Sequence, residues 1–182
     1  MITLGIDPGT LIAGYGVVES RRNTQTLRMI EYGEIHMSGD VSLSMRLKTL
    51  YEKLTAVIER TTPDECAIES AFYHKNIQST LKIGHARGVA LLAAAQREIP
   101  VQEYSPREIK KAITGNGGAS KEQVQYMICA MLKIKIKPKF FDSSDALAVA
   151  ICHHQRRNSP RATARTWSDY IEAHPEKVRK TR

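Results

Sequence analysis

Short apolar runs separated by turn residues dominate the first part of the chain. They cover residues 2–6, 14–18 and 27–37, and a turn of sequence Asp-Pro-Gly-Thr at residues 7–10 separates the first two. Runs of this length, bounded by Gly, Pro or polar residues, are typical of strands. Because the connections are short, the three segments are predicted to form an antiparallel meander.

The rest of the chain alternates between helical and extended patterns. Apolar residues recur at helical spacing in the predicted helices, at residues 45–58, 77–98, 106–113, 120–134 and 142–155. Short strands are predicted at residues 66–68 and 101–104. A meander followed by alternating helices and strands predicts an α/β fold with a mixed sheet flanked by helices. We expect one domain at residues 1–157 and a basic tail, partly ordered at most, at residues 158–182.

Four acidic residues lie where this pattern predicts element ends. Asp7 and Glu69 each close an apolar strand, while Asp142 and Asp145 open the last helix. Residues three apart on a helix share one face, so the two helical carboxylates can act together. If the four converge, they form an oxygen-only site for hard divalent cations such as Mg²⁺. Two such ions about 3.5–4 Å apart support phosphodiester cleavage by water.

Each of these acids also has a simpler structural interpretation. Asp7 in Asp-Pro-Gly is good turn chemistry, and Glu69 could point to solvent or pair with a cation. Asp142, followed by Asp145, is close to a capping box at a helix N-terminus. Capping and metal binding are compatible, so the sequence leaves both roles open.

Charge and cysteine content restrict the partners and the compartment. The formal net charge is +8. Residues 106–139 carry eight Lys or Arg against two Glu, and residues 158–182 carry six against three, so both segments suit an anionic partner such as DNA. The three cysteines lack Cys-x-x-Cys spacing and are expected to be buried small hydrophobes. No signal peptide or membrane span is apparent, which favours a reducing cytoplasm.

Several short motifs appear in order over residues 1–155. They are Gly5-Ile6-Asp7-Pro8-Gly9, Gly14-Tyr15-Gly16-Val17, Ala67-Ile68-Glu69 with Phe72 and Lys75-Asn76, Ala86-Arg87-Gly88-Val89-Ala90, Gly118-Ala119-Ser120-Lys121-Glu122-Gln123-Val124, and Asp142 with Asp145-Ala146-Leu147-Ala148. Together they closely resemble the RuvC family of bacterial Holliday-junction resolvases. The resemblance implies a ribonuclease-H-like fold, a homodimer, and Mg²⁺-dependent symmetric nicking of two opposed strands of a four-way DNA junction. It also suggests the RuvA and RuvB branch-migration assembly as a partner.

The resemblance assigns site residues one by one. It implies that the acidic tetrad Asp7, Glu69, Asp142 and Asp145 is catalytic and binds two Mg²⁺ ions, for which Mn²⁺ could substitute. It further implies DNA contacts by four residues: Phe72, Lys75, Lys110 and Lys121. The physical alternative for Phe72 is a core aromatic, and for the lysines a solvated face. Stacking of a base on an exposed aromatic would be worth about 1–3 kcal/mol.

Some features fall outside this assignment. The family commonly has a basic or polar residue soon after Asp-Pro-Gly, whereas this chain has Leu11-Ile12-Ala13, which puts a phosphate contact by that turn in doubt. His153 and His154 are adjacent on a helix and do not face one another, so we interpret them as ordinary helix-end residues. His74 is a better candidate for touching DNA. The Gly and Ala face of residues 77–98 is a candidate dimer surface, because glycines inside a helix cost about 1 kcal/mol each unless another backbone approaches them.

Two other functions compete with the nuclease. Gly-Ile-Asp-Pro-Gly-Thr at residues 5–10 also resembles the first phosphate loop of the actin, Hsp70 and sugar-kinase superfamily, which binds ATP between two such domains. This chain is too short for two. The second alternative is a scaffold that grips a DNA junction without cutting it, with the acids serving only as caps and turns. Binding of ATP would favour the first alternative, and binding of a junction without cleavage would favour the second.

Overall fold

The fold was obtained as a computed structural model that describes residues 1–20, 26–70, 77–134 and 141–157. The elements are, in chain order, β1 (Ile2–Asp7), β2 (Ile12–Ser20), β3 (Leu27–His36), α1 (Leu43–Thr61), β4 (Glu65–Glu69), α2 (Ile77–Ala95), β5 (Val101–Tyr104), α3 (Pro106–Thr114), α4 (Lys121–Leu132) and α5 (Phe141–Arg157). Every predicted strand and helix is present. Phe72, His74, Lys75 and the tail at 158–182 lie outside the described residues, so their assignments and the domain boundary stay predictions.

The sheet has five strands in the order β3-β2-β1-β4-β5. β1 pairs with β2, and β2 with β3, in the antiparallel sense, whereas β1–β4 and β4–β5 are parallel. The predicted meander and mixed sheet are therefore confirmed. This order puts β1 at the centre, with the ends of β1 and β4 next to each other.

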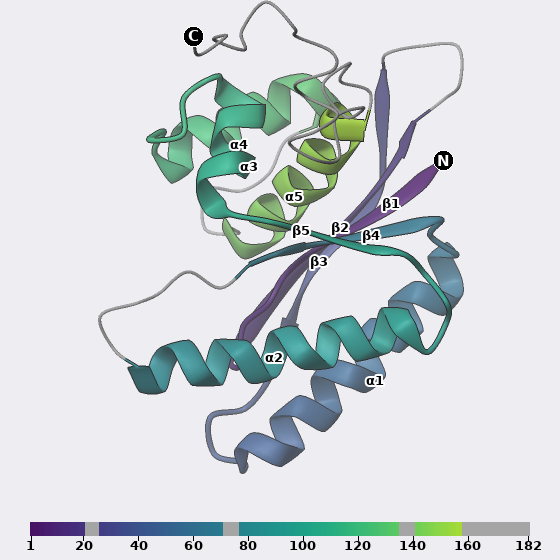
Figure 1. Ribbon diagram of the computed structural model, residues 1–182, viewed down its shortest axis with the longest axis vertical. Helices are drawn as coiled ribbons and strands as arrows, with labels where there is room; N and C mark the ends of the chain where they lie inside the picture. Colours follow the sequence, from purple (N-terminus) through teal and green to yellow (C-terminus); the bar gives the residue numbers. More distant parts are fainter. Residues whose placement is uncertain (21–25, 71–76, 135–140, 158–182) are drawn as a thin grey trace, which may run out of the picture.

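Helices cover both faces of the sheet (Figure 1). On one face α1 and α2 pack against apolar residues of β1, among them Leu4 and Ile6, which are fully buried with Leu50 and Leu54 of α1. On the other face α3, α4 and α5 enclose a second apolar cluster that includes Ile128. The molecule is thus a three-layer sandwich, with β1 at the centre of the middle layer.

The backbone of helix α5 packs directly against the backbones of β1 and β2 where those strands carry glycine. A Cβ placed on Gly14 of β2 would lie 1.9 Å from the carbonyl oxygen of Asp142, and one on Gly5 of β1 would lie 2.2 Å from that of Ala146. Both distances are far below van der Waals contact. The missing side chains therefore set how closely the first turns of α5 approach the ends of β1 and β2.

The buried alanines and the glycines of helix α2 lie on different faces of the helix. Ala86, Ala90 and Ala94 are buried in the cluster beneath the sheet. A Cβ on Gly84 or Gly88 would meet no atom of the described chain within 4 Å. The expectation of one shared Gly and Ala face is therefore wrong, because the alanines face the core and the glycines face outward.

The structure confirms the predicted burial for two of the three cysteines. Cys66 and Cys152 are buried, as expected, but Cys129 is only half-buried, and all three are free thiols. Burial raises the pKa of both the Cys66 and the Cys152 thiol to about 12, so neither is a thiolate near neutral pH.

Among the described residues, no helix has the length and apolar character needed to cross a membrane.

Candidate active site

Two of the four predicted acids lie at the ends of neighbouring parallel strands. Asp7 is the last residue of β1 and Glu69 the last residue of β4. The residues before them, Ile6 and Ile68, are partners in the sheet register. Adjacent strands are about 4.8 Å apart, so the two carboxylates leave the same edge of the sheet side by side.

The other two acids come from the first turns of α5. That helix begins at Phe141, so Asp142 lies inside its first turn and not at the N-cap position that the sequence suggested. Because Gly14 has no Cβ, the Asp142 carbonyl can approach the backbone of β2 closely. Asp145 follows one turn later and faces the same way.

Three of these carboxylates form a compact group. Asp7, Asp142 and Asp145 each offer an oxygen, and these oxygens all lie within 4.8 Å of one another, with all three residues half-buried. Glu69 is not a member of this tightest group, but it lies close enough for Asp7 and Asp145 to raise its pKa. The structure therefore brings together three aspartates and places the glutamate beside them.

Burial and mutual repulsion change the protonation of this group. Burial first, then Asp145 and Asp142, raise the pKa of Asp7 to about 7. Burial, followed by Asp7 and Asp145, raises the pKa of Glu69 to about 8. Such shifts mean that the carboxylates are poorly compensated by the protein alone. A set of clustered carboxylate oxygens short of positive charge fits a hard divalent cation.

Two lysines supply part of the missing positive charge. The Nζ atom of Lys121 lies 2.8 Å from Oδ2 of Asp145. Burial opposes the charge of Lys121, but this hydrogen bond and the nearby aspartates outweigh it, so its pKa is raised. Burial raises the pKa values of Glu69 and Asp145, and Lys110 of α3 offsets part of this rise. Both lysines thus lie at the acidic group, while their predicted contacts with DNA phosphates stay predictions.

The raised pKa of Asp7 leads to a prediction for stability without metal. The pKa is about 7 in the folded chain against 3.8 for an unperturbed aspartate, so a proton binds Asp7 more tightly in the folded chain than in the unfolded one. The stabilisation that this proton gives the fold is fully present below pH 3.8 and is lost as the pH rises through 7. In EDTA, Asp7→Asn should therefore raise the free energy of unfolding by about 2–4 kcal/mol at pH 8, and by much less at pH 4. Urea unfolding at both values measures it.

A matched variant tests whether the effect belongs to the site. Glu52→Gln removes an exposed carboxylate of α1 whose side chain is 58% exposed, and it should change unfolding little at either pH. Adding Mg²⁺ at pH 8 should stabilise the wild type but not Asp7→Asn. Loss of stability in Asp7→Asn at pH 8 in EDTA would contradict the repulsion described above.

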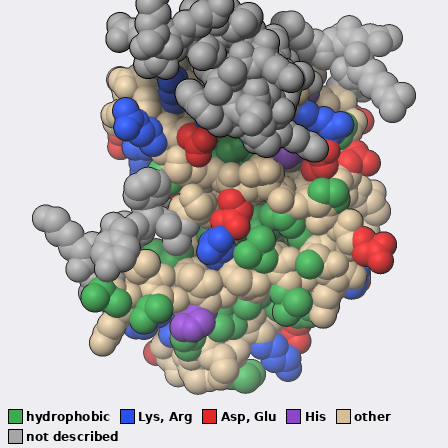
Figure 2. Space-filling model, in the orientation of Figure 1, with side chains coloured by type: hydrophobic (Ala, Val, Ile, Leu, Met, Phe, Trp, Pro, Cys, Tyr) green, Lys and Arg blue, Asp and Glu red, His purple; other side chains and the backbone are tan. Residues whose placement is uncertain are grey.

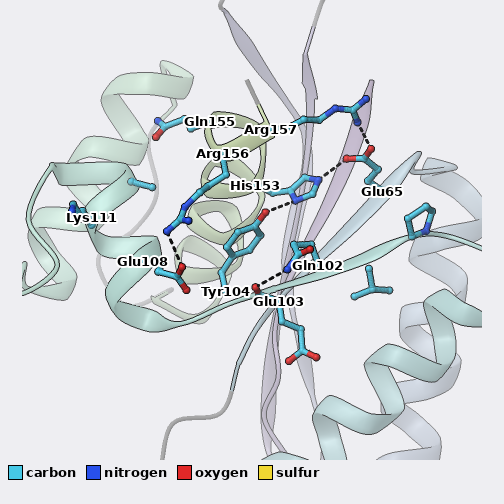
Figure 3. A pocket seen from close by; sticks show the side chains of 13 residues that line it. Glu65, Gln102, Glu103, Tyr104, Glu108, Lys111, His153, Gln155, Arg156 and Arg157 are labelled. Carbon is cyan, nitrogen blue, oxygen red and sulfur yellow. Dashed lines mark hydrogen bonds and ion pairs between the residues drawn. The ribbon is translucent and has the colours of Figure 1, made fainter. Parts of the chain in front are cut away.

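A pocket of about 920 Å³ lies elsewhere, along β5 and the far end of α5 (Figure 3). In it the buried His153 is hydrogen-bonded at both ring nitrogens, 2.8 Å from the Tyr104 hydroxyl and 2.5 Å from Glu65. Glu65 also pairs with Arg157, and Glu108 pairs with Arg156. These two hydrogen bonds of His153 link α5 to β4 and β5, which indicates a structural role.

Comparison with known proteins identifies the family of this chain. The family model for crossover junction endodeoxyribonuclease RuvC matches residues 3–153. This chain belongs to the RuvC family. The matched segment contains all four acids and both lysines described above.

Relatives in the RuvC family match over most of their length. Crossover junction endodeoxyribonuclease RuvC of Desulforamulus reducens is 49% identical over 155 residues, which cover 85% of this chain and 94% of the relative. That of Cytophaga hutchinsonii is 41% identical over 178 residues, covering 98% and 88%. The solved structure of Thermus thermophilus RuvC in complex with a Holliday junction substrate has a TM-score of 0.79 and 31% identity, and the match covers 85% of this chain and 93% of that one. The ribonuclease-H-like fold is therefore confirmed.

Proposed function

We propose that this protein is a structure-selective endodeoxyribonuclease that resolves four-way DNA junctions by paired symmetric nicks, in recombination and repair. The single observation that carries the proposal is the group of Asp7, Asp142 and Asp145 oxygens within 4.8 Å of one another in a chain of the RuvC family. Thermus thermophilus RuvC, solved with a Holliday junction substrate, supports the choice of DNA structure.

Asp7, Glu69, Asp142 and Asp145 are the catalytic residues and would hold the metal, for which we propose two Mg²⁺ ions that Mn²⁺ can replace. Bound there, divalent ions would supply Lewis-acid stabilisation of the attacking and leaving oxygens. Water is the nucleophile: its oxygen forms the new bond to phosphorus while the bond to the 3′ oxygen breaks. The products are a 5′-phosphate and a 3′-hydroxyl. Products ending in 3′-phosphate would contradict this route.

The neighbouring lysines orient the DNA strand at the acids. Lys121 is fixed at the start of α4 by the capping box of Ser120 and Gln123, and its amine already lies at Asp145. Lys110 approaches from α3. In the complex, both amines neutralise phosphates next to the cut, a contribution to affinity that falls steeply with salt. Phe72, by stacking on a base, and Lys75 complete the proposed DNA contacts from residues outside the described part of the chain.

We extend the proposal to a homodimer formed through α2. An exposed stripe of that helix contains Ile77, Leu81, Gly84, Gly88 and Leu92, spaced so that they share one face. The three apolar side chains are 50–62% exposed, and Figure 2 shows apolar side chains along the part of the surface that α2 occupies. A second copy laid against the glycines explains why they are kept inside a helix, where each costs about 1 kcal/mol relative to alanine.

Breaking this stripe should produce monomers. Leu81→Glu puts a charge on the proposed contact, so we expect the mass from light scattering after size exclusion to halve. Monomers should also lose paired cutting, since two active sites are needed for two simultaneous nicks. Tyr126→Glu is the matched variant, because Tyr126 of α4 is 74% exposed and lies off the stripe. A Leu81→Glu protein that keeps the mass of a dimer would refute this surface.

Cleavage of a mobile four-way junction against a matched linear duplex, each labelled on one strand at a time in Mg²⁺, tests the main proposal. Symmetric nicks in the junction alone support it, while equal cutting of both substrates would indicate a less selective nuclease. Binding without cutting, in every metal and junction sequence tried, would favour the scaffold. A DNA substrate of this kind implies action in the cytoplasm, with the RuvA and RuvB assembly as the proposed partner.

A further inference from the structure

Arg46 of α1 is a half-buried arginine whose charge the candidate active site does not explain, whereas Arg107, which also forms no ion pair among the described residues, is exposed. Six described arginines form ion pairs with carboxylates, namely Arg28, Arg60, Arg87, Arg97, Arg156 and Arg157. Within the described ranges, Arg46 has no carboxylate in ion-pair distance, although it is half-buried. Its Nε atom is closed off from solvent and has no hydrogen-bond partner there. The guanidinium therefore has no counter-charge among the described residues, which an anion bound at its other nitrogens would supply.

The position of Arg46 indicates where that anion would lie. Its Nη1 atom donates to the carbonyl oxygen of Thr10 at 3.3 Å. Thr10 belongs to the turn between β1 and β2, three residues after Asp7. The turn itself carries no cation, since Thr10 is followed by Leu11, Ile12 and Ala13. Arg46 therefore brings a positive charge from α1 to a turn that has none of its own.

Arg46 and the site lysines come from opposite faces of the sheet. Lys110 and Lys121 belong to the layer of α3, α4 and α5, whereas Arg46 belongs to the layer of α1 and α2 (Figure 1). Asp7 lies at the end of β1, the central strand of the sheet between these two layers. A DNA strand crossing this edge would have lysines on one side and a guanidinium on the other. Lys121 is paired with Asp145, whereas the guanidinium of Arg46 has no ion pair among the described residues.

From this geometry we infer that Arg46 binds a backbone phosphate of the strand that is cut, on the α1 side of the acidic group. The inference rests on the proposed function, because the junction supplies the phosphate. Guanidinium groups bind phosphate oxygens through two parallel hydrogen bonds, which fixes position as well as charge. Arg46 is thus a DNA-positioning residue that sets the register of the strand relative to Asp7, through a contact with no sequence preference.

The salt dependence of junction binding tests this contact. The equilibrium dissociation constant of the full-length protein for a four-way junction should be measured by fluorescence anisotropy in Ca²⁺ at several salt concentrations. Arg46→Gln should weaken binding about tenfold and reduce the slope of log affinity against log salt by about 0.9. Lys48→Gln is the matched variant: it removes one charge from the same helix, two residues away, and should change affinity less than about twofold.

Arg46→Lys separates a phosphate contact from simple support of the turn. It keeps the charge but loses the fork, so it should recover the wild-type slope with part of the affinity. An unchanged slope in Arg46→Gln, an equal effect of Lys48→Gln, or a lower unfolding temperature that alone accounts for the weaker binding would each overturn the inference. If the wild type neither binds nor cuts the junction, the proposed function itself fails. A wild type that cuts, beside an Arg46→Gln protein with an unchanged slope, refutes the phosphate contact alone.

Discussion

Asp7→Asn is expected to abolish junction cleavage while leaving junction binding nearly intact. Asp7 belongs to the group of three aspartates whose oxygens lie within 4.8 Å, and it also acts on the pKa of Glu69. Asparagine keeps the size of the side chain but removes the charge that a divalent cation needs. We expect the single-turnover rate to fall by about 10²–10³-fold at least, as for removal of other charge-stabilising groups at active sites.

The measurement compares cutting and binding on one substrate. Cleavage of a labelled mobile junction in Mg²⁺ gives the rate, and anisotropy in Ca²⁺ gives the affinity. Asp40→Asn, which changes an exposed acid in the connection between β3 and α1, should cut like the wild type. Substantial cutting by Asp7→Asn would remove Asp7 from the catalytic group. A wild type that binds but does not cut would support the scaffold hypothesis.

Gly14→Ala is expected to damage both stability and cleavage, although it adds only one methyl group. The new Cβ would lie 1.9 Å from the Asp142 carbonyl oxygen, so α5 or β2 must move by more than about 1 Å to accept it. Overpacking of this kind typically costs about 1–3 kcal/mol of folding free energy. Displacement of Asp142 and Asp145 relative to Asp7 should reduce cleavage by about 100-fold, since misplacement by 1 Å can have that effect.

Gly39→Ala is the matched substitution for this prediction. A Cβ on Gly39 would meet its nearest atom, in Leu11, at 3.7 Å, which is ordinary contact. Urea unfolding and single-turnover cleavage should therefore leave Gly39→Ala close to the wild type. Should Gly14→Ala match the wild type in both measurements, the close contact between α5 and β2 would not be what positions the acids.

The elements of the fold could be predicted because their signals are local. The predicted helices at 106–113 and 120–134 match α3 and α4, and each is preceded by an N-cap serine whose capping box is formed in the structure. The acids could be predicted because strand ends and a helix start place them, as Asp7 and Asp145 show. Local pattern and position in the sheet therefore account for most of the candidate site.

The remaining features depend on contacts between distant residues. The ion pair of Lys121 with Asp145 joins two helices across 24 positions of sequence, and no periodicity encodes it. The burial of His153 between Tyr104 and Glu65 likewise requires α5 to lie across two strands. The role of Gly14 could have been suspected from the Gly14-Tyr15-Gly16 motif, but its reason is the backbone of α5, which only the packed structure supplies.

The ion pair between Lys121 and Asp145 also bears on how cutting is switched on. It balances one charge of the acidic group within the chain itself, so that the group does not depend on a cation for all of its neutralisation. Near neutral pH, protonation of Asp7 and Glu69, whose pKa values are raised to about 7 and about 8, limits the repulsion that is left after chelation. Supply and removal of the cation could then start and stop the enzyme repeatedly, without a cycle of unfolding and refolding.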